Sequence, residues 1–208
     1  PTLTVSPLQP SEAHLYQEIR HETFRPTINK ILYTREPSPE TQSAIIAKTA
    51  SDIRDGVLYM VCRDTSLPST STTTSNIIAG ARWRYIGSHP PRPRTEAEIS
   101  ADLTVPEPYP ESHAETYRAF FSLFNDNRRE IMGDRPYMVL ETLVTHPDHH
   151  RRGAGSKLVK WGVEEADRLG VEGYVEASEM GAPLYERYGF REVKRVEMDL
   201  RRTGGGEE

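Results

Sequence analysis

The sequence has very little cysteine and no long apolar run. Cys62 is the single cysteine among 208 residues, so it cannot form an internal disulfide and fits a reducing compartment. No stretch of about 18 consecutive apolar residues is present, which argues against a membrane-spanning helix. Residues 1–10 also lack the basic flank and apolar block of a signal peptide. We therefore expect a cytoplasmic protein with no membrane partner.

An excess of positive charge is also missing. The 26 Lys and Arg residues are outnumbered by 31 Asp and Glu residues, for a net charge of −5. Nucleic-acid partners usually require a basic surface, so we expect none here. The acidic balance is compatible with a cationic partner such as an amine. The length allows one well-buried core, and we expect residues 1–208 to form a single domain.

The first half of the chain alternates between short strand and helix patterns. Strands are predicted over 2–8, 57–62 and 77–86, and one helix is predicted to begin at Ser11. A second helix is predicted to begin at Ser38-Pro39-Glu40, because this is a capping residue followed by proline and an acid. Residues 67–75 are rich in Ser and Thr and predict an exposed, mobile loop.

Residues 88–135 are predicted to be an insertion. Its first part, 88–110, is rich in proline and indicates irregular structure, and Ser112 and Glu115 then match a capping box. The helix that follows has an aromatic stripe at helical spacing, formed by Tyr117, Phe120, Phe121 and Phe124. Such a stripe is typical of core packing, and the alternative is a lid that lines a pocket.

The clearest pattern begins at Tyr137. Residues 137–145 are almost continuously apolar, which predicts a strand covered on both faces. A polar loop and an amphipathic helix over 154–169 follow, and Gly170 is placed to end that helix. A strand over 171–177, a short helix over 183–188 and a last strand over 193–200 complete the prediction, with a disordered tail at 201–208.

The loop before the 154–169 helix has the chemistry of an anion site. At a helix N-terminus several backbone N–H groups are free to bind an anion. Gly153 and Gly155 let the backbone approach a ligand, and Arg151 and Arg152 add positive charge. A tight turn with solvated arginines is the alternative. The loop does not fit a P-loop, because Lys157 follows Gly155 and Ser156 at the wrong spacing. It does not fit a Rossmann fingerprint either, because Leu158 stands where the third glycine would be.

Two blocks resemble the GNAT superfamily of N-acetyltransferases. The loop His-Arg-Arg-Gly-Ala-Gly at 150–155 is similar to the family's phosphate loop, Gln/Arg-x-x-Gly-x-Gly/Ala. The segment Gly-Ala-Pro-Leu-Tyr-Glu-Arg-Tyr-Gly-Phe at 181–190 is similar to the family's Ala-x-x-Leu-Tyr-x-x-x-Gly-Phe. Three positions depart from the family pattern: His150 replaces Gln or Arg, Ser178 replaces a common Asn, and Gly181 replaces a common Ala.

The resemblance implies an α/β fold, a GNAT-like mixed twisted sheet with helices on both faces and a splay between two central strands. It also implies acetyl-CoA as co-substrate, with the pantetheine arm along strand 137–145. The backbones of Leu143, Val144 and Thr145 would hold pantetheine and the thioester, and Ser178 would face the arm. The pyrophosphate would be held by His150, Arg151, Arg152, Gly153, Ala154, Gly155 and Ser156.

Two residues are candidates for the chemistry. By resemblance, the Tyr185 hydroxyl would protonate the departing thiolate, and its alternative role is ordinary packing. Glu141 is a carboxylate in an apolar strand, so burial would raise its pKa and suit it to serve as a base. The equal alternative is a structural pair with Arg82 or Arg84. His146, His149 and His150 match no zinc pattern, and we expect no metal.

The resemblance therefore implies an N-acyltransferase that moves an acetyl group from acetyl-CoA to a primary amine on a small molecule or a peptide. The alternatives are a non-catalytic acyl-CoA-binding module and a protein-lysine acetyltransferase. Either a monomer or a homodimer is compatible with the sequence.

Overall fold

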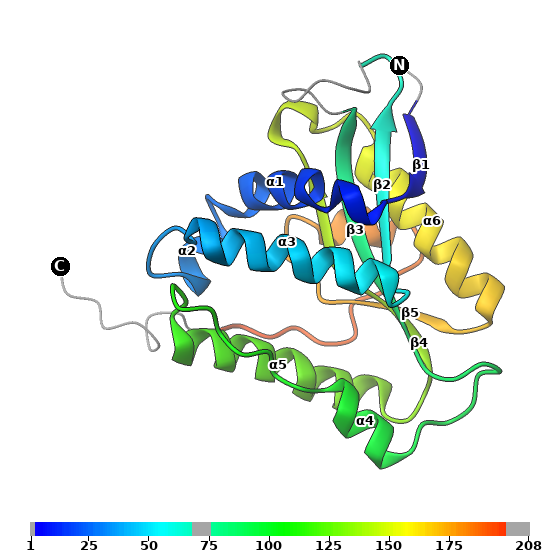
Figure 1. The fold of residues 1–208 in the computed structure, drawn as a ribbon. Helices are drawn as coiled ribbons and strands as arrows, with labels where there is room; N and C mark the ends of the chain where they lie inside the picture. The colour runs from blue at the N-terminus through cyan, green and yellow to red at the C-terminus, as the bar shows by residue number, and fades with distance from the viewer. Residues whose placement is uncertain (1–2, 68–75, 199–208) are drawn as a thin grey trace.

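The computed structural model describes residues 3–67 and 76–198 as five strands and the helices around them (Figure 1). The strands are β1 (Leu3–Pro7), β2 (Leu58–Asp64), β3 (Ile77–Ile86), β4 (Tyr137–Thr145) and β5 (Glu172–Val175). The α-helices are α1 (Ala13–Phe24), α2 (Ile28–Leu32), α3 (Pro39–Arg54), α4 (Glu96–Asp102), α5 (Ala114–Met132), α6 (Ala154–Leu169) and α7 (Ala182–Glu186). Two 3₁₀ turns, η1 (Pro10–Glu12) and η2 (Pro147–His149), complete the set.

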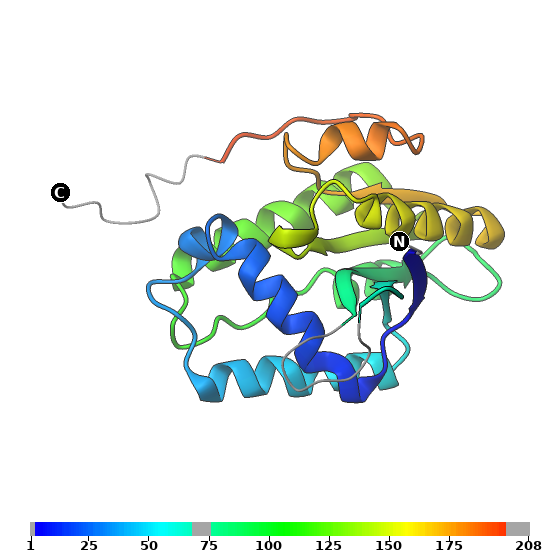
Figure 2. The same ribbon diagram turned by 90° about the horizontal axis from the view of Figure 1, so that it is seen from above.

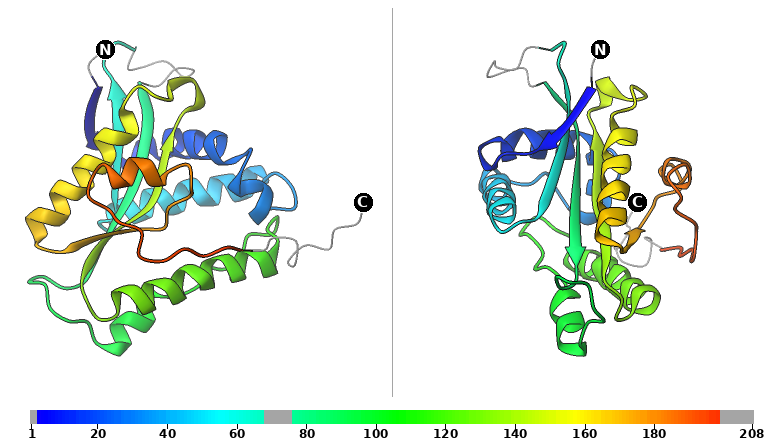
Figure 3. Two further views of the ribbon diagram at one scale, coloured as in Figure 1. Left: turned by 180° about the vertical axis from the view of Figure 1, so that it is seen from behind. Right: turned by 90° about the vertical axis from the view of Figure 1, so that its right-hand side faces the viewer.

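The strands form one mixed sheet in the order β1-β2-β3-β4-β5. The first four strands are antiparallel to their neighbours, and β5 runs parallel to β4. Helices α1 and α3 lie on one side of the sheet and α6 lies on the other, with α7 beyond it (Figures 2 and 3). The predicted mixed sheet with helices on both faces is therefore confirmed. None of the helices in the described residues is long and apolar enough to cross a membrane.

Several predicted elements have the observed bounds. Strands β3 and β4 and helix α6 begin and end where the sequence pattern places them, and Gly170 ends α6 in the left-handed conformation at φ 68°. These are the elements with the strongest patterns: two buried strands and a helix with one apolar face. Weaker patterns were less informative, since the helix predicted from Ser11 begins at Ala13 after a 3₁₀ turn and α2 was not predicted.

The insertion is more regular than predicted. Helix α4 lies within the segment that was expected to be irregular, and its N-terminus carries a capping box formed by Thr95 and Glu98. The capping box predicted at Ser112 is wrong, because His113 is the N-cap of α5 and the Ser112 hydroxyl is buried without a hydrogen-bond partner. A Ser-x-x-Glu pattern is satisfied only where the chain turns into the helix at that serine.

The predicted last strand is absent over residues 193–198, which have no regular structure. Val193 remains 72% exposed, so no neighbouring strand covers the alternating apolar side chains of this segment. The predicted tail at 201–208 and most of the predicted loop at 67–75 lie outside the described residues.

Beyond Leu140, strands β4 and β5 separate. The last parallel pair is Leu140 with Val175, so Glu141 and Glu176 are the first residues of the two chains that do not pair. On its other side β4 has a bulge at the same place, since Trp83 pairs with Leu140 and Arg82 pairs with Thr142. We call the point where β4 and β5 diverge, at Glu141 and Glu176, the fork. It is the predicted splay.

Helix α6 packs closely on the sheet because Gly162 has no side chain. The fully buried Trp83 indole lies against it, and a Cβ at Gly162 would be 2.1 Å from two of the ring carbons. Such a contact forces the indole or the helix to move.

We expect Gly162→Ala to destabilise the fold by about 1–3 kcal/mol, since overpacking outweighs the helix propensity that alanine adds. Urea unfolding measures this change. Gly155→Ala in the same helix is the control, because its nearest neighbour would lie at 3.6 Å and stability should be almost unchanged. Equal stabilities for the two variants would contradict the close packing of α6 on Trp83.

Candidate functional site

The end of β4, the start of α6 and helix α7 converge around Gly155. A Cβ placed on Gly155 would lie 3.6 Å from Leu184 Cδ2, 3.8 Å from Leu143 Cδ2 and 3.8 Å from Thr145 Oγ1. Residues from two other elements, β4 and α7, therefore lie against the first turn of α6. The two sequence blocks that carried the resemblance meet at this point, although 25 residues (156–180) separate them in the chain.

The loop before α6 is shaped to present backbone donors. Arg151 at φ 60° and Gly153 at φ 88° are both left-handed, and a Cβ on Gly153 would meet nothing within 4 Å. No side chain caps the N-terminus of α6. The first N–H groups of a helix have no partner inside it, so this end presents free donors and the positive end of the helix dipole. The residues present fit an anion such as a phosphate.

The two loop arginines have different roles. Arg152 forms an ion pair with Asp64 at the end of β2, and its Nη1 lies 2.7 Å from His149 Nδ1. Hydrogen bonds from Ser66, and then the one from Arg152, lower the pKa of Asp64 to about 2. That both arginines add positive charge for a ligand at the loop stays a prediction. The charge of Arg152 is opposed by Asp64, and Arg151 is exposed.

The loop histidines lie near one another without forming a metal site. The His146 and His149 rings are 5.6 Å apart, and burial followed by the charge of Arg152 lowers the pKa of His149. Within residues 3–67 and 76–198, no group of three or more His, Cys, Asp or Glu side chains could hold a metal ion.

The end of β4 has one free edge. Leu143, Val144 and Thr145 pair with β3, and their other side lies beyond the last pair with β5. The Thr145 carbonyl accepts a hydrogen bond from Thr23 Oγ1 at 3.1 Å and lies 2.9 Å from His150 Nε2. His150 therefore fixes the loop to the strand through its ring. An extended ligand could pair with the exposed edge of β4.

Ser178 and Tyr185 belong to the third element of the site. The Ser178 side chain accepts a hydrogen bond from Gly181 N at 3.2 Å, so it shapes the turn that leads into α7. Gly181 leaves room for the Tyr185 ring, because a Cβ there would lie 3.1 Å from Tyr185 Cε2. The ring also packs against Phe190. Burial raises the pKa of Tyr185 above its ordinary value of 10, so the hydroxyl keeps its proton.

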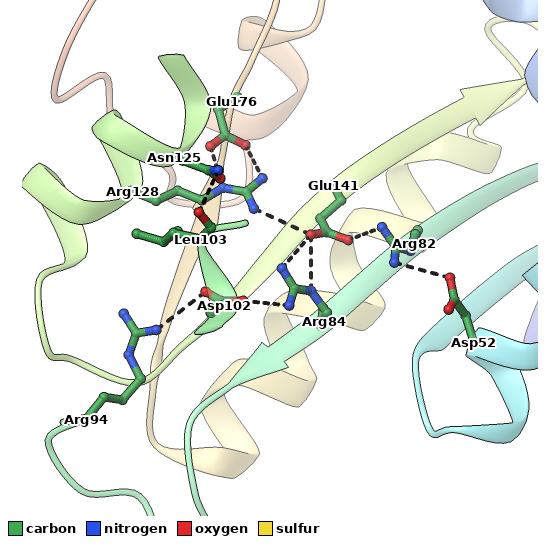
Figure 4. A network of polar contacts seen from close by, with 10 residues as sticks. All are labelled: Asp52, Arg82, Arg84, Arg94, Asp102, Leu103, Asn125, Arg128, Glu141 and Glu176. Carbon is green, nitrogen blue, oxygen red and sulfur yellow. Dashed lines mark hydrogen bonds and ion pairs between the residues drawn. The ribbon is translucent and has the colours of Figure 1, made fainter. Parts of the chain in front are cut away.

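Glu141 lies in the middle of a buried ion network (Figure 4). Arg84 donates to Glu141 Oε1 through Nε at 3.1 Å and Nη2 at 2.9 Å, and Arg128 Nη1 lies 3.4 Å from the same oxygen. Arg82 Nη1 lies 2.5 Å from Oε2 as an ion pair without hydrogen-bond geometry. The three arginines are bound in turn by three other carboxylates, those of Asp52, Asp102 and Glu176.

This network changes the electrostatics that the sequence suggested. Burial alone acts to raise the pKa of Glu141, but the charges of Arg82, Arg84 and Arg128 outweigh it and hold the pKa below the ordinary 4.5. The predicted rise in the pKa of Glu141 is therefore wrong. The sequence indicates that Glu141 lies in an apolar strand, but it does not indicate which cations face it. The alternative prediction, a structural ion pair with Arg82 or Arg84, is present in the structure with both arginines.

Arg128 and Glu176 were missed as site residues. A signal was present: Arg128 follows Tyr117, Phe121 and Phe124 at helical spacing, so a cation lies on the apolar stripe of α5. Its side chain is only 9% exposed. A charge on such a stripe is costly unless it is paired, which predicts an acidic partner without naming it.

Comparisons with known proteins agree with this geometry. Residues 119–192 match the family model described as the acetyltransferase (GNAT) domain. The structure of mosquito arylalkylamine N-acetyltransferase like 5b aligns with a TM-score of 0.60 at 15% identity, over 93% of this chain and 85% of that one. A predicted acetyltransferase with acetyl-CoA from Clostridium acetobutylicum aligns with a TM-score of 0.54 at 15% identity, over 96% and 97% of the two chains. An agmatine N-acetyltransferase mutant in its apo form aligns with a TM-score of 0.59 at 14% identity, over 90% of this chain and 81% of that one.

The matched segment includes the candidate site, and the fold is shared with solved acetyltransferases. Its mixed sheet and flanking helices have the architecture of known acetyltransferases, and the matched residues include β4, the anion loop and Tyr185. Residues 119–192 are thus similar to the GNAT acetyltransferase domain, and the fold of the described chain is the fold of solved acetyltransferases.

Proposed function

We propose that the protein transfers an acetyl group from acetyl-CoA to a primary amine. The observation that carries the proposal is that an uncapped helix N-terminus and a free strand edge meet around Gly155, beside Leu184, the chain neighbour of Tyr185 in α7. The loop amides would bind the pyrophosphate, the edge of β4 beyond Leu140 would bind the pantetheine arm, and Tyr185 would lie at the thioester end.

The reaction requires little more from the chain. A neutral amine attacks the thioester carbonyl carbon, the C–N bond forms, and the C–S bond breaks. The developing oxyanion needs a donor, which a backbone N–H at the β4 bulge would supply. We propose that the Tyr185 hydroxyl donates its proton to the leaving thiolate, while the amine loses its own proton to water. Glu141 would act through the charge balance of the site and not as a base, since its pKa is lowered.

The acceptor class has support from two neighbours, which are named for arylalkylamine and agmatine acetylation. Both of those names refer to small amines. We therefore propose a small primary amine as acceptor before a peptide terminus. The experiment is a mass-spectrometric screen of amines and short peptides with acetyl-CoA, in which the acetylated product and free CoA should appear together. Acetyl-CoA binding without turnover of any amine would instead identify a binding module.

The loop assignment gives a separate prediction. Acetyl-CoA at about 100 times its Kd should stabilise the fold by about 2.7 kcal/mol and raise Tm by roughly 5–10 °C. Gly153→Asp should abolish this rise, because it places a carboxylate beside the phosphates. Gly153→Asn is the matched control, since asparagine has the same size, tolerates a positive φ and adds no charge. Thermal melts measure the shifts, and an undiminished rise in the Asp variant would refute the assignment.

A further inference from the structure

The fork between β4 and β5 is bridged by one side chain from a distant helix. Arg128 of α5 binds Glu176 through two hydrogen bonds, Nε to Oε1 at 2.7 Å and Nη2 to Oε2 at 2.9 Å. Its remaining nitrogen, Nη1, lies 3.4 Å from Glu141 Oε1. One guanidinium thus contacts the first unpaired residue of both strands, as Figure 4 shows.

The bridge is buried and its charges depend on one another. The side chains of Arg128, Glu141 and Glu176 are 9%, 11% and 13% exposed. Without Arg128, Glu176 would lose the two hydrogen bonds given above, whereas Glu141 would keep Arg82 and Arg84. The remaining repulsion between the two carboxylates, no longer offset by a cation that contacts both, would act to move the strands. A planar guanidinium can bind both at once in a fixed geometry, whereas an ammonium is a point charge on a flexible stem that does not fix the geometry.

Helix α5 is itself fixed on both sides of Arg128. Asn125 Nδ2 donates to the carbonyl of Leu103 at 3.0 Å, and Arg94 Nη2 donates to the carbonyl of Gly133 at 2.8 Å. Met132 packs in the same core cluster as Val139 and Tyr174. The guanidinium therefore has a defined place with respect to both strands, and it transmits the position of α5 to the fork.

We propose that Arg128 is a positioning residue that sets the divergence of β4 and β5. It keeps the free edge of β4 at the spacing that the pantetheine arm requires, and this consequence rests on the proposed function. Arg128 touches neither the loop nor Tyr185 in the described contacts. It acts through Glu141 and Glu176, so its loss should affect cofactor capture more than the chemical step.

The test is Arg128→Lys, with Arg129→Lys as the matched control. Arg129 is the next residue on α5, and its ion pair with Glu96 is exposed. In Arg128→Lys, hydrogen exchange should rise at least about tenfold at the amides of Tyr174 and Val175, the last paired residues of β5, with β2–β3 amides unchanged. The KM for acetyl-CoA should rise about tenfold while kcat at saturation changes less than about threefold. Arg129→Lys should match the parent in every measurement.

The outcomes separate the two proposals. Arg128→Lys with parental exchange at β5 and a parental KM would overturn the positioning role, as would exchange that rises equally over the whole sheet. If Arg128→Lys does not fold, Glu176→Gln replaces it, because it keeps the volume and the Arg128–Glu141 contact. Glu176→Gln should show the same local rise in hydrogen exchange at the end of β5, with a smaller change in KM. Parental exchange and a parental KM in this variant would again overturn the positioning role. If exchange rises at the fork but the parent does not bind acetyl-CoA, the positioning of the strands stands and the proposed function fails.

Discussion

Tyr185→Phe is expected to lower kcat by roughly 100- to 10,000-fold, the range that a general acid contributes when it is fully used. The substitution removes one hydroxyl and keeps the ring that packs against Phe190. Affinity for acetyl-CoA should therefore change little, and so should Tm. Steady-state kinetics with an accepted amine, together with calorimetry of cofactor binding, measure the two effects separately.

Tyr188→Phe is the control for this prediction. Tyr188 is half-buried three residues further on and packs beside the same core, but the family motif gives it no role. Its kcat should be parental. Because burial raises the pKa of Tyr185, any alkaline fall in the kcat of the parent that reports this hydroxyl should come at a higher pH than for an exposed tyrosine. A Tyr185→Phe variant that turns over at the parental rate would show that the thiolate leaves without this proton.

Glu141→Gln should produce the largest loss of stability. The substitution leaves Arg82, Arg84 and Arg128 with one carboxylate fewer in a buried network, and breaking such a network costs about 3 kcal/mol or more. Each arginine keeps one other acidic partner, which limits the loss. For a chain of this size we expect Tm to fall by roughly 6–12 °C. Urea and thermal unfolding measure the change.

The pH dependence of this loss follows from the lowered pKa. A carboxylate whose folded pKa lies below its unfolded value stabilises the fold fully above that unfolded value, and the contribution disappears as pH falls through the folded pKa. The stability difference between the parent and Glu141→Gln should thus be constant near neutral pH and shrink below about pH 4.5.

Glu96→Gln is the control for Glu141, because its ion pair with Arg129 is exposed and should change stability by less than about 0.5 kcal/mol. One result would instead support the alternative prediction, that Glu141 is the catalytic base. In that case Glu141→Gln would keep the parental Tm, lose much of kcat and lose the acidic limb of the pH–rate profile.

Local patterns predicted some elements closely and others poorly. The apolar run that became β4 and the amphipathic stripe that became α6 each have one stable arrangement, since their side chains must be covered. The segment at 193–198 has the alternation of a strand but lacks a partner in the described structure, and Val193 is left exposed. Strand formation depends on a neighbour, which a sequence pattern does not contain.

In the candidate site, too, local features were predictable from the sequence and long-range contacts were not. The glycine-bearing loop and the Leu-Tyr block were recognisable because backbone conformation and helix ends are local properties, and both lie where they were expected. The partners of the charged residues were not recognisable. Asp64 is 88 residues from Arg152, and Glu176 is 48 residues from Arg128.

The sequence by itself therefore predicted the resemblance to GNAT acetyltransferases, the glycine-bearing loop at 150–155 and the place of Tyr185, because each depends on residues that are close in the chain. The tertiary structure decided the electrostatic state of the site. It opposed the charge of Arg152 with Asp64, placed three arginines around Glu141, and brought Arg128 to the fork. The physical reason is that the pKa of a buried group is set by the sum of burial and nearby charges, and those charges come from strands and helices that only the fold brings together.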